Sequence, residues 1–427
     1  MIKKIFFKLK KVGFKKTFYD LMNYLFKNFN YSLKFILKSV SLRNFYDLLT
    51  IRNFNKNKYV NVVLCIDTEG PKSEFIKDQN MLWHDLNKRL SMLMSESFRN
   101  KYKDSFGNNL TLNWFIMDHS GFNENPYNVN MGYGTVFKNY QNLFKKFPNI
   151  KDGVYWHYHH PRNDGKFSPE YYWNSNWNDN KEYYNILNHR IIDFNFFPTV
   201  YRAGGTIERN ESSNWLEKWI PFDFSNRAPY STKDKYKWEK ALSNWEVYNP
   251  NKEDYQIKGD IKRTIARCLS IDDPKEFNLK EIIKAFKETY KGNKVILSFF
   301  SHDFNNKLFK RINYLYSSLK LVSQITGIKF KFNNSLNAMQ ETLNYNKINK
   351  LNIKIIKKDD YISINSNNEL FGDHPYIVTL NKNNNYKNYK SIKERNGWKF
   401  KFDKNVKKIG VAAVDIYGQS YIKVLKI

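Results

Sequence analysis

The sequence has little cysteine, few acids relative to its bases, and no long unbroken apolar stretch. With two cysteines in 427 residues, Cys65 and Cys268, it offers no disulfide framework and is typical of a reducing compartment. No stretch reaches the roughly 18–20 apolar residues of a membrane-spanning helix. Early lysines are present, but a sustained apolar region and a small-residue cleavage site are lacking, which argues against a secretory signal. We therefore expect a protein kept in the cytoplasm.

Acidic residues are scarce: 41 Asp and Glu stand against 71 Lys and Arg, which gives a formal net charge of +30. A basic surface attracts nucleic-acid phosphates and anionic membranes. The basic residues are spread along the whole chain, and no motif for base or phosphate readout is recognisable. We therefore expect no nucleic-acid partner and regard an anionic membrane surface as the more natural one. A steep salt dependence of oligonucleotide binding would support the nucleic-acid alternative.

A chain of this length exceeds one ordinary core, and residues 1–58 form the first expected unit. Apolar side chains recur there at helical spacing with lysines between them, and the only acids are Asp20 and Asp47. A basic amphipathic helix typically lies in a membrane interface, which would place the protein on the inner face of the cytoplasmic membrane. The alternative is a helix packed on the body of the protein with its lysines in water.

The second expected unit, residues 59–345, alternates apolar strands with helical stretches, a pattern that predicts an α/β parallel sheet or barrel. The expected strands include residues 62–66, 112–117, 153–158, 198–201, 294–300 and 330–332, and residues 230–271 read as a polar insert in which no element is predicted. Polar clusters follow the strands, so they would meet at one rim. Residues 346–427 show short strands separated by Asn, Gly and Asp, which predicts a small β-sandwich.

The first expected strand runs directly into Asp67 and Glu69, followed by Gly70. Because these acids are two residues apart, both carboxylates would point to the same face of a continuing strand. They would repel each other unless a cation sits between them or one takes up a proton. A strand that simply ends in a polar loop is the alternative, and the clusters that follow argue against it.

Three of the eight histidines crowd the end of the third expected strand, in W-H-Y-H-H-P. His157 and His159 alternate there and can point the same way. Two imidazoles and one carboxylate make a natural divalent-metal site with a position left for water. His160 is a reserve ligand if a bend before Pro161 exchanges its role with a neighbour's, and Asp118 is another. The alternative is a polar strand end with hydrogen-bonded histidines.

Further along the chain, Arg202 precedes Gly204 and Gly205, a glycine pair that can bring backbone N–H groups close to a ligand. Asp223 and His302 each follow an expected strand. A carboxylate that fixes an imidazole near an activated water is a recurrent acid–base arrangement. Singly, each residue is more often structural, but their combination in this order predicts a catalytic site.

The order of these clusters resembles that of the polysaccharide deacetylases, the NodB-homology carbohydrate esterases (carbohydrate esterase family 4-like). The matching segments are D-T-E-G, W-H-Y-H-H-P, Y-R-A-G-G, P-F-D-F-S and L-S-F-F-S-H-D-F. The family more often has adjacent aspartates in the first motif and histidines four apart in the second, and this chain departs from it in both. The resemblance covers residues 59–343 and implies a deformed (β/α) barrel.

The resemblance also implies a role for each candidate residue. Glu69, His157 and His159 would hold a divalent metal, with Zn²⁺ as the first choice. Asp67 would be the general base, kept ionised by Arg202, and His302, oriented by Asp223, would protonate the leaving amine. Backbone N–H groups near Gly204 and Gly205 would stabilise the oxyanion. Trp173 and Trp177 would stack on sugar faces, with packing inside the protein as the alternative.

The implied activity is removal of N-acetyl groups from amino sugars of a surface polysaccharide, such as lipopolysaccharide or capsule, or of its lipid- or nucleotide-linked precursor. Two other readings stay open. One is a metal-free, deacetylase-like pseudoenzyme that binds glycans, and the other is a deacylase of a non-sugar amide. The metal content of the pure protein and acetate release from acetamido sugars distinguish them.

Overall fold

The computed structural model describes residues 16, 51, 58–70, 83–119, 134–159, 177, 182–231, 237–345 and 348–427. Almost all of the expected amphipathic segment at 1–58 lies outside these residues, as do the reserve ligand His160 and the candidate sugar-binding residue Trp173.

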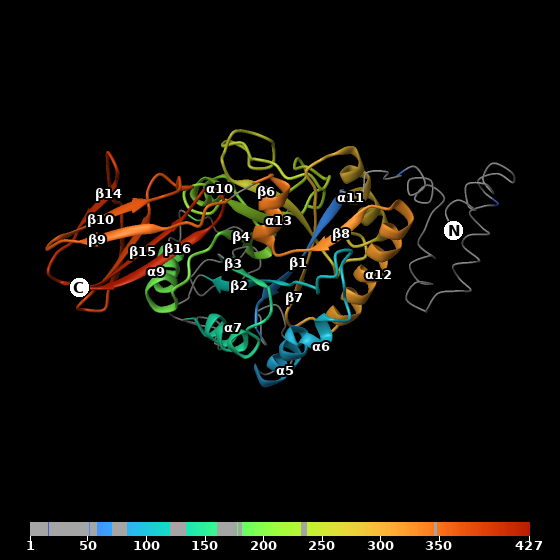
Figure 1. Ribbon diagram of the computed structural model, residues 1–427, viewed down its shortest axis with the longest axis horizontal. Helices are drawn as coiled ribbons and strands as arrows, with labels where there is room; N and C mark the ends of the chain where they lie inside the picture. Colours follow the sequence, from blue (N-terminus) through green and yellow to red (C-terminus); the bar gives the residue numbers. More distant parts are fainter. Residues whose placement is uncertain are drawn as a thin grey trace.

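Parallel strands close into a seven-stranded barrel (Figure 1). Its strands in ring order are β1 (Tyr59–Thr68), β2 (Asn113–His119), β3 (Gly153–His159), β4 (Val200–Ala203), β5 (Phe222–Asn226), β6 (Thr264–Ser270) and β7 (Ile296–His302). The second half of β1 pairs with β2 and closes the ring, while β8 (Lys329–Phe332) pairs with the first half of β1. The predicted α/β barrel is thus confirmed at the level of a closed parallel barrel, and β6 lies inside the stretch read as an insert.

Helices surround the ring: α5 (Trp83–Met94), α6 (Glu96–Arg99), α7 (Thr135–Lys146), α9 (Glu182–Phe194), α10 (Asn210–Leu216), α11 (Leu279–Lys291), α12 (Leu308–Thr326) and α13 (Ser335–Thr342). Helix α11 shows why they form. The Asn278 side chain accepts from Glu281 N at its start, and Gly292 ends it in the left-handed region with φ of 93°. Its buried side, which includes Ile282 and Phe286, packs into the same core as the outer side chains of β1.

Side chains on the two faces of a barrel strand pack in different cores. On β1, Val62 and Leu64 belong to the core shared with the helices, whereas Val63 and Cys65 belong to a second cluster. That second cluster takes side chains from all seven barrel strands, so it fills the barrel interior. The thiols of Cys65 and Cys268 meet there as free cysteines, with Sγ atoms 3.8 Å apart. Because side chains alternate along a strand, membership of this cluster tells which neighbouring residues point inward.

The C-terminal strands form two antiparallel four-stranded sheets, in the orders β13-β14-β10-β9 and β12-β11-β15-β16. Their bounds are β9 (Ile353–Lys357), β10 (Tyr361–Ser366), β11 (Tyr376–Asn381), β12 (Tyr386–Tyr389), β13 (Ile392–Glu394), β14 (Gly397–Lys401), β15 (Val406–Val414) and β16 (Ser420–Lys426). Ile362 and Phe400 of one sheet share a core with Ile377 and Val411 of the other, which confirms the predicted β-sandwich.

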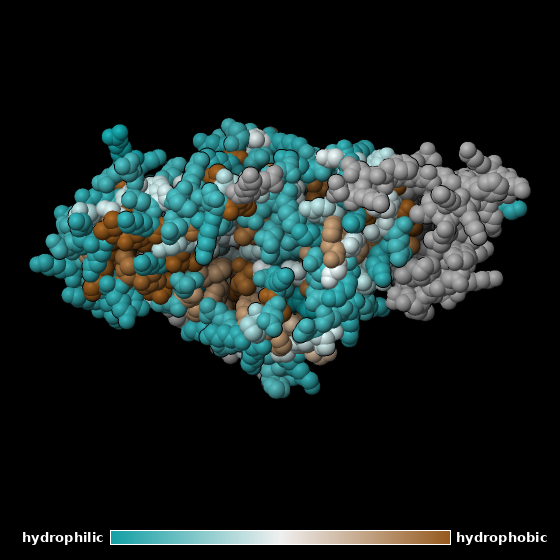
Figure 2. Space-filling model, viewed as in Figure 1, coloured by the Kyte–Doolittle hydropathy of each residue, from teal (hydrophilic) through white to brown (hydrophobic). Residues whose placement is uncertain are grey.

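Helix α9 joins the sandwich to the barrel, at the left of the barrel in Figure 1. Val378 and Ala412, on the outer face of the second sheet, share a core with Ile186 and Ile191 of α9. This sheet is therefore covered on both faces, which explains the continuous burial of β11. The face in Figure 2 is mostly hydrophilic, with hydrophobic residues gathered over the C-terminal sheets. Within the described ranges, no helix is long and apolar enough to cross a membrane.

Candidate metal centre

Three side chains that could hold a metal ion converge at the carboxyl-terminal ends of β1 and β3. The Oε1 atom of Glu69 lies 3.3 Å from Nε2 of His159, which in turn lies 3.0 Å from Nε2 of His157. One ligand atom from each of the three residues lies within 4.8 Å of the others, and all three residues are buried. The structure therefore brings together the three residues predicted as metal ligands.

Strand alternation places the histidines. Tyr155 points into the barrel interior, so His157 and His159, two and four residues further along β3, point inward as well. Gly204, on the turn after β4, makes room for them: a Cβ atom there would lie 2.6 Å from the ring of His159. The glycine predicted to bind substrate thus has a packing role beside the imidazole, and Gly205 next to it adopts a positive φ of 60°.

The tautomer of His157 follows from its hydrogen bond. Its Nδ1 lies 2.9 Å from the carbonyl oxygen of Arg202. Because a carbonyl oxygen can only accept, Nδ1 carries the proton and Nε2 of the neutral ring presents a lone pair to the cluster. Burial lowers the pKa of His157 to about 4, which keeps the ring neutral.

Arg202 holds Asp67 beside this cluster. Its Nε lies 2.8 and 2.9 Å from the two carboxylate oxygens, and its Nη1 donates to the carbonyl of Phe224 at 2.9 Å. The guanidinium also stacks on Phe300, 3.7 Å from the ring centroid. Asp67 Oδ2 is 3.8 Å from Nε2 of His157, so the predicted base lies next to the predicted ligands. Both partners of the Asp67–Arg202 pair are buried.

His302, at the end of β7, lies on the other side of Glu69. Its Nε2 is 3.4 Å from Glu69 Oε1, its ring stacks on Phe304, and 31% of the side chain is exposed. Burial lowers the pKa of His302, but Glu69, Asp67 and Asp272 together outweigh burial and raise this pKa to about 9. Burial raises the pKa of Glu69 in turn, but His302 and His159 hold it well below its usual range.

The donor set fits a divalent cation. Glu69 Oε2 is buried and, among the described residues, has no hydrogen-bond partner. An unsatisfied buried carboxylate oxygen is costly, and two imidazole nitrogens 3.0 Å apart repel unless a proton or a cation lies between them. One carboxylate and two imidazoles are the three protein ligands of many catalytic zinc sites, which leave a fourth position open.

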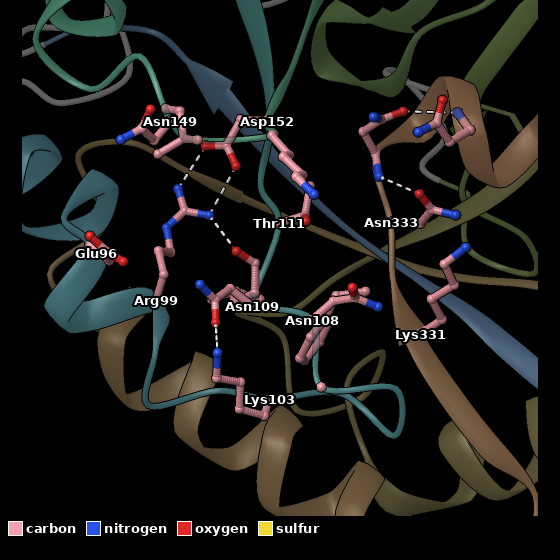
Figure 3. A pocket seen from close by; sticks show the side chains of 17 residues that line it. Glu96, Arg99, Lys103, Asn108, Asn109, Thr111, Asn149, Asp152, Lys331 and Asn333 are labelled. Atoms are coloured by element: carbon pink, nitrogen blue, oxygen red, sulfur yellow. Dashed lines mark hydrogen bonds and ion pairs between the residues drawn. The ribbon is translucent and has the colours of Figure 1, made fainter.

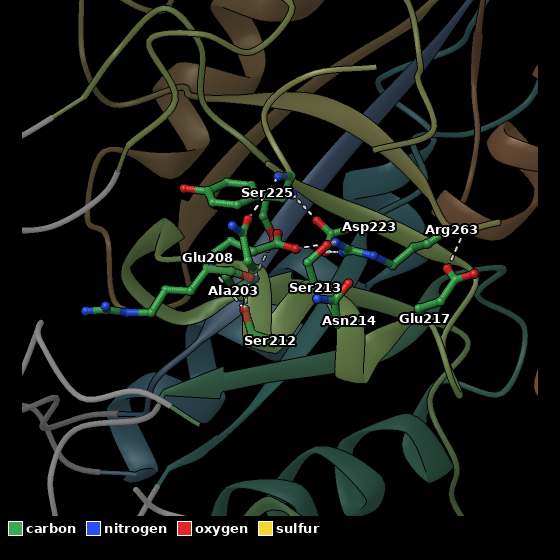
Figure 4. A network of polar contacts seen from close by, with 12 residues as sticks. Ala203, Glu208, Ser212, Ser213, Asn214, Glu217, Asp223, Ser225 and Arg263 are labelled. Atoms are coloured by element: carbon green, nitrogen blue, oxygen red, sulfur yellow. Dashed lines mark hydrogen bonds and ion pairs between the residues drawn. The ribbon is translucent and has the colours of Figure 1, made fainter. Parts of the chain in front are cut away.

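The predicted contact between Asp223 and His302 is wrong. Phe222 and Phe224 fill the barrel interior, so Asp223 between them points outward. Its carboxylate accepts from Arg263 Nη1 at 2.5 Å and from Ser225 N at 2.6 Å (Figure 4). Glu208 also pairs with Arg263, so two buried acids share one guanidinium.

The Asp223 network nevertheless supports the strand next to the site. The Ser225 hydroxyl, beside Asp223, accepts from the backbone N–H of Ala203 at 2.8 Å. Ala203 follows Arg202 directly on β4. Asp223 is therefore placed to stabilise the β4–β5 pairing that carries Arg202.

Two further residues with predicted functional roles, Trp177 and Asp118, instead make contacts inside the protein. Trp177 is 1% exposed and lies among Trp156, Tyr183 and other aromatic side chains, so stacking on a sugar is ruled out in this arrangement. Asp118 points away from the interior of the barrel toward α9, where it pairs with Arg190 and accepts from Trp156 Nε1 at 3.0 Å. Asp118 is thus not one of the clustered candidate ligands.

A cavity of about 520 Å³ lies elsewhere, at the amino-terminal ends of β2 and β3 (Figure 3). Asparagines and lysines line much of it, and the Arg99–Asp152 ion pair crosses one side. None of the clustered residues at the carboxyl-terminal rim lines this cavity. The chemistry therefore has to be sought at the rim of the barrel and not in this cavity.

No known family model matches the chain, and no curated protein matches it. Among solved structures, it is similar to a Bacteroides thetaiotaomicron protein assigned provisionally as an alpha-L-fucosidase, with 11% identity, a TM-score of 0.32, and coverage of 87% of this chain and 90% of the other. The chain is also similar to catalytically inactive OgpA from Akkermansia muciniphila, solved in complex with an O-glycopeptide. The identity is 12%, the TM-score is 0.15, and the match covers 89% of this chain and 96% of the other. At these TM-scores neither likeness supports a function, so the functional argument rests on the cluster.

Proposed function

We propose that this protein is a metal-dependent hydrolase that removes N-acetyl groups from amino sugars of a surface polysaccharide or of its lipid- or nucleotide-linked precursor. The observation that carries the proposal is the convergence of Glu69, His157 and His159 beside the buried Asp67–Arg202 pair. The order of the motifs along the chain, which resembles that of the polysaccharide deacetylases, supplies the substrate class.

Glu69, His157 and His159 would hold the cation, and Zn²⁺ suits two imidazoles and a carboxylate. When bound, the cation would polarise the acetamide oxygen and lower the pKa of a water molecule. The proton released as water attacks the carbonyl carbon has a nearby acceptor in Asp67. Arg202 contacts both oxygens of Asp67 and fixes the position of the carboxylate that would serve as the general base.

His302 is suited to the opposite proton transfer. Glu69 favours its protonated form, and its partly exposed ring lies at the outer side of the cluster. Collapse of the tetrahedral adduct breaks the C–N bond, and His302 can donate the proton that the departing sugar amine needs. A proton acceptor and a proton donor beside the same cluster are what acid–base catalysis requires.

Location and domain division belong to the same proposal. Residues 1–58 would hold the enzyme on the inner face of the cytoplasmic membrane, where lipid-linked precursors are assembled, and 59–345 and 346–427 would be its barrel and sandwich domains. The motivation is the near absence of acids among residues 1–58. Deleting these residues should abolish co-sedimentation with anionic vesicles; unchanged co-sedimentation would refute this part.

The central test measures metal content and acetate release on the same preparations. Zinc-loaded wild-type protein should contain about one ion per chain and release acetate from acetamido sugars. Glu69→Gln and His159→Ala should each lose most of the metal because a ligand is removed. His374→Ala, which alters a half-buried histidine of the sandwich, is the matched control and should keep it.

Metal-free wild-type protein that still binds glycans would replace the proposal with the pseudoenzyme alternative. Metal-loaded protein that hydrolyses only non-sugar amides would retain the site and change the substrate class.

A further inference from the structure

The carboxylate of Asp303, one residue beyond His302, lies beneath the turn that carries Glu69. Its Oδ1 accepts from the backbone N–H of Glu69 at 3.2 Å, and its Oδ2 accepts from that of Gly70 at 3.1 Å. The hydroxyl of Tyr140 donates to Oδ2 at 2.8 Å. Asp303, Glu69 and Tyr140 are all buried, so bulk water does not compete for these hydrogen bonds.

These bonds take over where the β1–β7 ladder ends. The two strands are in register up to the pair of Asp67 and His302, and the backbone N–H of Asp303 then donates to the carbonyl of Asp67 at 3.1 Å. Beyond that point the carboxylate of Asp303 replaces backbone carbonyls as the acceptor for β1. Gly70, with φ of 80°, then turns the chain away. The backbone of Glu69 is thereby fixed by a side chain and not by the sheet.

The acceptor itself is anchored by two helices. Tyr140 belongs to α7, whose Val136, Phe137 and Leu143 are buried in the outer core, and its ring packs against Trp114 with centroids 5.5 Å apart. From α5, Arg89 Nη1 donates to the carbonyl of Phe304 at 2.8 Å, directly after Asp303. The position of the carboxylate is therefore determined from both sides.

We propose that Asp303, held by Tyr140, is the positioning residue of the metal centre: it fixes the Glu69–Gly70 backbone so that the Glu69 carboxylate faces His157 and His159. Asp303 touches no ligand atom of the cluster and acts only through Glu69. The inference rests on the proposed function for the presence of a metal, but not for the reaction or the substrate.

Asp303→Asn tests this role with little change in size. Two backbone N–H groups and a hydroxyl point at the carboxylate, and an amide has one oxygen to accept with, while its NH₂ group would face a donor. The turn should relax, and the Zn²⁺ affinity should fall by about 10- to 100-fold, the range typical of residues that orient metal ligands. Tyr140→Phe removes one of the three donors and should weaken Zn²⁺ binding in the same direction, by less.

Asp104→Asn is the matched control. Asp104 is also a buried carboxylate that fixes a turn: it accepts from the backbone N–H groups of Phe106 at 2.8 Å, Asn108 at 2.9 Å and Phe332 at 3.1 Å. It lies near the first half of β1, far along the strand from Glu69. Its amide variant should lower the melting temperature without changing Zn²⁺ affinity.

The experiment measures the Zn²⁺ affinity of the full chain by competition with a chromogenic chelator, with melting temperatures recorded in parallel. Equal affinity of Asp303→Asn and wild type, in protein that is folded, would overturn the inference and leave the proposed function standing. Wild type that binds no Zn²⁺ would overturn both. If Asp303→Asn does not fold, Tyr140→Phe decides, and unchanged affinity in that variant overturns the role.

Discussion

At the amino-terminal end of the barrel, the carboxylate of Asp152 accepts two hydrogen bonds from Arg99, one from the backbone of Leu112 and one from the indole of Trp114. At the carboxyl-terminal end, Glu69 Oε2 has no partner among the described residues, and two imidazole nitrogens face each other. Both regions are buried and charged. A fully satisfied carboxylate stabilises a fold, whereas convergent donors that satisfy one another poorly could hold a cation.

The largest expected effect is on catalysis at the carboxyl-terminal end. Asp67→Asn keeps the shape of the side chain but cannot accept a proton, and general-base catalysis contributes roughly 100- to 10,000-fold. Acetate release should therefore fall by about that factor, while zinc content stays near that of wild type. If Asp67→Asn loses its zinc while Glu69→Gln retains it, the two carboxylates have exchanged roles.

The matching change at the other end should affect stability instead. Asp152→Asn breaks the buried ion pair with Arg99, and removing one partner of such a pair costs about 3–5 kcal/mol of folding free energy. Urea unfolding should show this loss, and acetate release per folded molecule should be unchanged. A stable Asp152→Asn protein with impaired turnover would mean that the two ends are not functionally distinct.

Zinc should stabilise the protein only through the cluster at the carboxyl-terminal end of the barrel. At a free zinc concentration of about 100 times Kd, binding to the folded state alone adds about 2.7 kcal/mol. The melting temperature of wild type, and of Asp152→Asn from its lower starting point, should rise on adding zinc. Glu69→Gln should show little rise, and a rise equal to that of wild type would place the ion elsewhere.

A third network, around Glu208, is intermediate between the fully satisfied Asp152 carboxylate and the poorly satisfied Glu69 cluster, because two acids share Arg263. Burial raises the pKa of Glu208 to about 8, with Arg263 opposing and Asp223 adding to the shift. The unfolded chain releases this proton near pH 4.3 and the folded chain only near pH 8, so the free energy of unfolding should fall as pH rises between them.

Glu208→Gln cannot titrate, so its free energy of unfolding should fall less than that of wild type over the same pH interval. Melting temperatures at pH 5 and pH 8.5 provide the comparison. Parallel pH profiles for wild type and Glu208→Gln would show that this carboxyl does not carry the proton.

How far the sequence predicts the site depends on the alternation of side chains along each strand. The pattern of β1 and β3 indicated strands, and alternation then placed Glu69 beside Asp67 and His157 beside His159. Both histidines do point into the barrel. The same reasoning gave no orientation for Asp223, because Phe222 and Phe224 could have faced the helices as readily as the interior. Strand β6 was missed because Arg263 and Arg267 make the stretch look polar, although both guanidinium groups are buried and paired.

The sequence by itself determined the barrel-type alternation, the C-terminal sandwich and the shared face of His157 and His159, because these follow from local periodicity of two or of 3.6 residues. Only the tertiary structure decided which face of each strand lines the barrel and which carboxylates are already satisfied. It also decided that Trp177 is core and that Asp303 reaches back to the turn of Glu69. Such features depend on contacts between different parts of the chain, and no local pattern encodes them. Asp303 and Glu69, for example, are more than 200 positions apart.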